Sequence, residues 1–234
     1  MFGFLRSYVM IAVTVVGGAA AGYSEAQLLS FVWLGQGLLG VLLLWGWNDL
    51  ADRIRSGDVV MDLLRPQHPV VYFLAADLGR AAYAFLTRFF APMLVGALCF
   101  TLYVPQRWPT YPLGAASIVL GVVISFGCRY LVNAASFWLM DSRGVNLVWL
   151  VCSGLLAGLY FPLRFLPEPL LLLIWIGTPM PSMLQAPLDV LVERDGLTGQ
   201  LAIVGGQIAW AAALIGLCFL VQRRAERKLV VQGG

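Results

Sequence analysis

The sequence predicts an all-α integral membrane protein with six transmembrane helices. Hydrophobic residues make up 60% of the 234 residues and charged residues only 12%, against about 45–50% and about 25% in soluble domains. Apolar runs of about 20 residues, the length of a helix that crosses a bilayer, recur along the chain. They lack the alternating pattern of barrel strands. We therefore expect residues 1–234 to form a single transmembrane helical domain.

The first two predicted helices cover residues 8–21 and 28–47. The first is short and follows Arg6, so it fits either a retained span or a signal peptide cleaved near its run of alanines. We favour a retained span. The second is long enough to cross the membrane and ends in two tryptophans, which are typical of the membrane interface.

Residues 70–103 form an apolar segment that is too long for one simple crossing. Asp77, Arg80 and Arg88 would fall within a stripe about 80° wide on a helix. We interpret the first part as an amphipathic helix at the inner interface and residues 89–103 as the third span. Asp77 and Arg80 are three residues apart and can form a structural ion pair. The alternative is that these charges line a substrate or proton path.

The fourth to sixth spans are predicted at residues 113–133, 145–160 and 197–221. Arg129 lies near the inner end of the fourth span, four residues before Asn133. It either extends to the interface or lines a cavity. Residues 161–190 are apolar but contain six prolines. This pattern favours two short re-entrant helices at the outer side over one straight span.

The distribution of basic residues orients the predicted bundle, because cytoplasmic loops carry an excess of lysine and arginine. Three arginines fall in outer segments: Arg107, Arg164 and Arg194. Nine basic residues fall in inner segments: Arg6, Arg53, Arg55, Arg65, Arg143, Arg223, Arg224, Arg227 and Lys228. Both termini, and the segment 48–69, are therefore expected in the cytoplasm.

Residues 48–69 carry seven of the 27 charged residues of the chain. The pattern predicts two short helices that meet at Gly57, with Asp58 capping the second. The second helix is expected to present an apolar face made of Val59, Val60, Leu63 and Leu64. Of these, Leu63 and Leu64 are expected to pack back on the bundle. The segment is either an ordinary interfacial loop or a docking element that passes force from a soluble partner to the spans. We favour the docking element.

The motifs of soluble enzymes are missing or out of context. The stretch GQGLLG at residues 35–40 matches a dinucleotide fingerprint but lies inside a span, where its glycines are expected to allow close helix packing. The chain has one lysine, Lys228, with no phosphate-binding loop before it. One histidine and scattered acidic residues make no metal cluster. We predict no enzymatic activity, no cofactor, no metal and no nucleic-acid partner for this chain.

Three stretches resemble a known family: IRSGDVVMDLLRP at residues 54–66, the proline-spaced segment at 153–187 and the ending RRAERKLVVQGG. Together with the six predicted spans they resemble ABC transporter permeases of the type-two exporter class, most closely a bacterial subgroup of short, separately encoded permeases. The resemblance covers residues 22–234. Members usually have a longer N-terminus, with an amphipathic helix before the first span, and this chain departs from them there.

The resemblance implies that residues 49–66 hold a coupling helix seated on a separate ABC ATPase subunit, which binds ATP and Mg²⁺. Two ATPase subunits and a second permease, of the same or a different chain, would complete an exporter in the bacterial inner membrane. The implied coupling residues are Asp52, Arg53, Arg55, Gly57, Asp58, Asp62, Leu63 and Arg65. The apolar spans favour a lipophilic or amphipathic substrate. The alternative is an ATP-independent secondary transporter or a membrane scaffold.

Overall fold

The computed structural model describes residues 2–17, 20–139 and 143–232, which contain helices and no strand. Four described helices are long and apolar enough to cross a membrane: Glu25–Leu42, Pro69–Cys99, Thr110–Phe137 and Leu197–Arg227. Shorter apolar helices are Phe2–Val13, Arg143–Leu156 and Glu168–Gly177. The all-helical prediction is confirmed. The count of six spans stays a prediction, because the first and fifth predicted spans correspond to two of the shorter helices.

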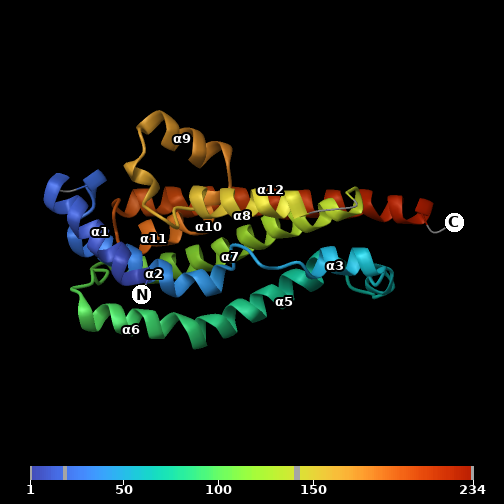
Figure 1. Cartoon of the computed structure of the whole chain (residues 1–234), viewed down its shortest axis with the longest axis horizontal. Helices are drawn as coiled ribbons and strands as arrows, with labels where there is room; N and C mark the ends of the chain where they lie inside the picture. The colour runs from blue at the N-terminus through green and yellow to red at the C-terminus, as the bar shows by residue number, and fades with distance from the viewer. Residues whose placement is uncertain (1, 18–19, 140–142, 233–234) are drawn as a thin grey trace.

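The long helices lie side by side along the long axis of the molecule (Figure 1). The elements before the third long helix are α1 (Phe2–Gly17), η1 (Ala20–Gly22), α2 (Glu25–Leu42), α3 (Asp49–Ser56), α4 (Val59–Leu63), α5 (Pro69–Ala84), the π turn η2 (Phe85–Phe89) and α6 (Phe90–Cys99). The later elements are α7 (Thr110–Ala134), η3 (Ala135–Phe137), α8 (Arg143–Leu156), η4 (Leu163–Phe165), α9 (Glu168–Gly177), α10 (Met180–Met183), α11 (Gln185–Leu191) and α12 (Leu197–Gln232).

The two ends of the bundle carry different elements (Figure 1). One end, called the inner end here, holds α3, α4, the start of α8 and the last turns of α12. The opposite, outer end holds the loop between α6 and α7, α11 and the start of α12. Arg164 and Arg194 pair with Asp189 and Asp195 at the outer end. That this end faces the outside of the membrane stays a prediction.

The position of α1 differs from the prediction. Gly3 lies against the ring of Trp33, halfway along α2, and Phe4 meets the same ring edge-on. The far end of α1 leads to Ala21, whose carbonyl accepts a hydrogen bond from Arg194 at the outer end. Arg6 is therefore buried beside the outer half of α2 and does not lie at the inner end. The prediction that both termini are cytoplasmic stays a prediction.

The helix that follows α4 also differs from the prediction. In place of an interfacial helix followed by a separate span, α5, η2 and α6 form one continuous helix over Pro69–Cys99, interrupted only by the π turn. The physical reason is that Asp77 is buried and paired with arginines on both sides. The charge that suggested a water-exposed interface is satisfied inside the bundle.

The proline-rich segment forms only short helices, as predicted. Prolines stand at the first positions of α9 and α10, and α11 follows directly after α10. The α11 helix is buried against α7 and α12, whereas α9 projects away from the bundle (Figure 1). Whether these helices re-enter the membrane from the outer side stays a prediction.

The glycines of the GQGLLG stretch serve helix packing, because the stretch lies within α2. A Cβ atom at Gly37 would lie 2.8 Å from the ring of Phe89 and 3.1 Å from its carbonyl oxygen. The absence of a side chain at this position therefore lets α2 approach the π turn closely.

We predict that Gly37→Ala lowers the free energy of unfolding by about 1–3 kcal/mol, because the added methyl group overpacks a backbone contact. Gly79→Ala is the matched control, since a Cβ atom there meets nothing within 4 Å, and alanine is the better helix former by about 1 kcal/mol. Thermal unfolding in detergent compares the two. Equal stability of both variants would contradict the packing role of Gly37.

Candidate functional site

The segment after α2 forms two short helices, α3 and α4, as predicted. Leu50 and Ala51 bury one face of α3 against the bundle. Gly57 follows α3 with a φ of +84°, a left-handed conformation that favours glycine, and it turns the chain into α4. The sequence therefore identified both helices and the residue at their junction.

Asp62 holds the two helices together. Its carboxylate accepts hydrogen bonds from Arg53 of α3 at 2.8 and 2.9 Å and lies 3.7 Å from Arg65. Only 3% of Asp62 is exposed. The guanidinium of Arg65 also lies over the ring of Tyr72 at the start of α5. Asp62 is thus an internal tie, and Arg53 serves partly to neutralise it.

Two details of the predicted segment are wrong. Asp58 does not cap α4 with its side chain, and its carboxylate instead accepts a hydrogen bond from Ser56 at 2.7 Å. Leu64 does not pack back on the bundle, because it is exposed. On the predicted apolar face Val59 is buried and Val60 is exposed. A helix of five residues has too few turns to bury a whole apolar face. The side chain of Leu63 lies outside the described residues.

The tip of the segment presents a mixed apolar and charged surface. Met61 and Leu64 are 64% and 75% exposed. Asp52 and Arg55, which pair at 3.4 Å, and Asp58 are exposed nearby on the same segment. Large apolar side chains that remain exposed next to charges are typical of a surface that contacts a partner. The sequence pattern did not indicate Met61 as a contact residue, because its exposure depends on the shortness of α4.

Asn133 anchors this segment to α7. Its side-chain oxygen accepts a hydrogen bond from the backbone N–H of Ala51 at 3.2 Å. Its side-chain nitrogen donates to the carbonyls of Trp47 and Arg129 at 2.9 and 2.8 Å. One buried amide therefore joins α7 both to the linker before α3 and to the first turn of α3.

A buried ion-pair network joins α7 to α5 and α2. Asp77 accepts hydrogen bonds from Arg80 at 2.8 Å and from Arg129 of α7 at 2.7 Å. Arg80 also donates to the carbonyls of Gly40 and Val41, which belong to the last turn of α2, where carbonyls lack intrahelical donors. The predicted Asp77–Arg80 pair is confirmed.

The other two candidate charges, Arg129 and Arg88, lie in different surroundings. Arg129 is 1% exposed and lines a cavity, so it does not extend to the interface. Arg88 is exposed and lies against Gly40, and no ion pair joins it to the network among the described residues.

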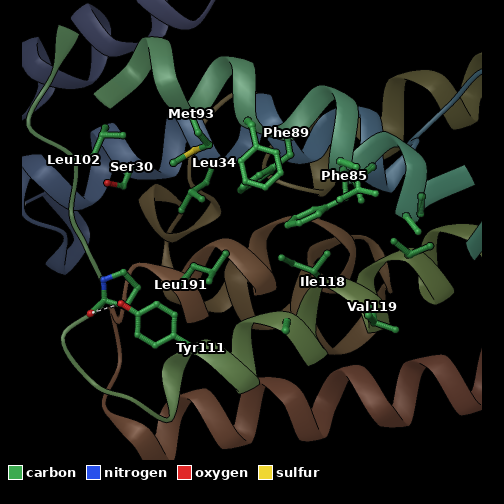
Figure 2. Close-up of a pocket in the computed structure, with 18 of the residues that line it drawn as sticks. Ser30, Leu34, Phe85, Phe89, Met93, Leu102, Tyr111, Ile118, Val119 and Leu191 are labelled. Carbon is green, nitrogen blue, oxygen red and sulfur yellow. Dashed lines mark hydrogen bonds between the residues drawn. The ribbon is translucent and has the colours of Figure 1, made fainter. Parts of the chain in front are cut away.

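A large apolar cavity separates α5–α6 from α7 (Figure 2). Its volume is about 970 Å³, near the upper end of the range for small-molecule sites. Phe85, Phe89 and Met93 line one wall and Ile118 and Val119 the other, all pointing into the space between the helices in Figure 2. The cavity can accept an apolar group of considerable size.

A loop held by Glu193 lies at the outer end of this cavity. Burial raises the pKa of the Glu193 carboxyl, but hydrogen bonds from Thr110, Tyr103 and the backbone N–H groups of Arg107 and Gln106 outweigh it and lower the pKa to about 2. The carboxylate is therefore charged at neutral pH. It attaches the loop between α6 and α7 to the end of α11.

The fold defines a multi-pass membrane protein with two short helices, α3 and α4, at one end of the bundle. The family model described as ABC-2 family transporter protein matches residues 4–233, and the chain belongs to this family. No curated protein and no solved structure matches the chain. The chain is an ABC-2 type permease, a transport subunit and not an enzyme, and its family implies association with an ABC ATPase.

We predict that Asn133→Leu loosens α3, because the N–H of Ala51 and the carbonyl of Trp47 lose their partner. Amide hydrogen exchange in α3 should accelerate about tenfold, equivalent to about 1.4 kcal/mol. Asn48→Ala is the matched control, since Asn48 makes no side-chain capping bond to α3. Unchanged exchange in the Asn133 variant would show that α3 is held by other contacts.

Proposed function

We propose that the chain is the membrane-spanning permease subunit of an ATP-driven exporter and that the α3–α4 segment seats on a separate ABC ATPase subunit. The observation that carries this proposal is the projecting surface of Met61 and Leu64, attached to α7 through Asn133. ATP and Mg²⁺ belong to the partner in this proposal. In this proposal the membrane is the bacterial inner membrane, and the end of the bundle with α3, α4 and the last turns of α12 faces the cytoplasm. The N-terminal end of the chain, which the sequence also predicts there, starts beside Trp33 in the middle of α2 and is not assigned to that face.

The contacts supply a route from the docking surface to the spans. Closure of the ATPase dimer on ATP displaces α3–α4, and Asn133 passes the displacement to α7. The pair of Asp77 with Arg129 then links α7 to α5, while Arg80 links α5 to α2. Because α5–α6 and α7 form opposite walls of the apolar cavity, their relative movement changes access to it.

The cavity supports a lipophilic or amphipathic substrate. Its walls are almost entirely apolar. Its few polar groups are already paired: the backbone N–H of Tyr103 donates to the hydroxyl of Ser30 at 2.6 Å, and the Tyr111 hydroxyl donates to the carbonyl of Pro105. A strongly polar substrate would lose its hydration there without gaining partners. A second permease, either another copy or a different chain, completes the transporter in this proposal.

Coupling variants test the docking assignment. We expect Gly57→Pro, and the double variant Arg53→Glu/Arg55→Glu, to leave membrane insertion intact but to uncouple ATP hydrolysis from transport by about tenfold or more, equivalent to about 1.4 kcal/mol. Proline cannot adopt the positive φ of Gly57, and the double variant also places a carboxylate beside Asp62. Transport and ATPase activity are measured together in proteoliposomes.

The matched control is Arg223→Glu/Arg224→Glu, an equal charge change on exposed residues of α12 toward the same end of the bundle. The single variant Arg55→Glu leaves the Arg53–Asp62 tie in place and isolates the surface contribution. Normal coupling in both α3–α4 variants would reject the docking assignment, and a clean oligomer without any ATPase would favour a secondary transporter.

The cavity makes a second prediction. Ala115→Trp should block it, because Ala115 lines the cavity, whereas its neighbour Ala116 is exposed and does not. We expect the variant at 115 to lower transport of a fluorescent fatty-acyl probe in proteoliposomes about tenfold, with ATPase binding retained. Ala116→Trp is the matched control. Equal transport by the two variants would show that the cavity is not on the substrate path.

A further inference from the structure

A second, smaller cavity lies at the inner end between the α2–α3 linker, α7 and α8. Its volume is about 230 Å³. It is lined by three tryptophans together with polar side chains: Trp45, Trp47, Trp149, Asn48, Arg129 and Asn146. A hollow of about 360 Å³ shares Asn48, Asn146 and Leu150 with it and adds Arg55 and Arg143. The cavity and the hollow therefore adjoin, and the two arginines line the hollow.

The charges around this cavity do not balance. Among the described residues, Asp77 is the carboxylate that pairs with both Arg80 and Arg129, so this group of three side chains carries one excess positive charge. Arg129 uses Nη2 for Asp77 and Nε for Ser125, but its buried Nη1 has no hydrogen-bond partner among the described residues. A buried charge with an unused donor is costly unless an opposite charge approaches it.

The asparagines and tryptophans suit an anion that reaches Arg129. Asn48 and Asn146 each offer two amide N–H donors. Tryptophan is enriched at the membrane interface, where its ring lies at the level of the lipid head groups. Arg55, which pairs with Asp52, and Arg143 line the adjoining hollow.

We infer that this cavity is a binding site at the inner membrane interface for a phosphate group that carries no attached cation, with Arg129 as its buried cation and Asn146 and Asn48 as its polar walls. A volume of about 230 Å³ holds a head group but not a whole amphiphile. The exposed apolar residues of α8, Leu147 and Leu150, lie beside the opening, where a lipid chain would continue. The inference concerns binding and does not depend on the proposed transport function.

The test measures binding to the full-length protein, together with any subunit that copurifies. Phosphatidylglycerol and phosphatidylcholine of matched chains are titrated and bound lipid is counted by native mass spectrometry. We expect phosphatidylglycerol to bind about tenfold to a hundredfold more tightly, the range for hydrogen bonds to a charged group. Titration with inorganic phosphate forms a parallel arm. Binding of phosphate alone identifies a free anion as the ligand, and binding of phosphatidylglycerol alone identifies a lipid head group.

Variants at Asn146 connect binding to this cavity. Asn146→Asp places a carboxylate in the shared wall and should abolish the preference, and Asn146→Phe should do so by filling the space. Both leave the Asp77–Arg129 pair intact, whereas Arg129→Ala would remove one of the two arginines that pair with Asp77. Gln67→Glu is the matched control, because it adds the same charge to an exposed residue at the inner end outside the cavity. Equal binding of both lipids with no binding of phosphate, or a preference kept in both Asn146 variants, would overturn the inference.

Discussion

The buried pair of Asp77 with Arg129 is the contact on which the arrangement of the spans depends. It joins residues 52 positions apart in the sequence at 2.7 Å, with both side chains almost completely buried. Separating them would leave the buried charge of Arg129 without an ionic partner in a low-dielectric interior. Breaking such a pair costs far more free energy than forming it gains. The pair therefore holds α5 against α7 whenever the bundle is folded, and Arg80 extends the restraint to the end of α2.

In the proposed mechanism, this restraint lets a bundle with a large apolar cavity transmit movement. The inner halves of α5 and α7 are joined by charge, while farther out α6 is separated from α7 by the cavity (Figure 2). Asn133 lies one turn from Arg129 on α7 and holds α3. A displacement at α3 thus reaches a rigid junction before it reaches the cavity walls, as a two-state transporter requires.

Much of this fold is predictable from local pattern. Apolar run length predicts the helices, glycine at position 57 predicts the junction of α3 and α4, and the spacing of Asp77 and Arg80 predicts their ion pair. The partners of Arg129 and Asn133 are not predictable, because they lie on elements far away in the sequence. The same holds for α1, whose register on α2 is set by the packing of Gly3 against Trp33.

The central claim is that the α3–α4 tip contacts an ATPase, and site-specific photocrosslinking in the native membrane tests it most directly. A photoreactive residue in place of Met61 at the exposed tip should form an adduct with a soluble subunit that carries a Walker motif. The same residue in place of Trp108, which is exposed at the opposite end, should form no such adduct. Adducts of Met61 with lipid alone, or identical products from both positions, would contradict the account.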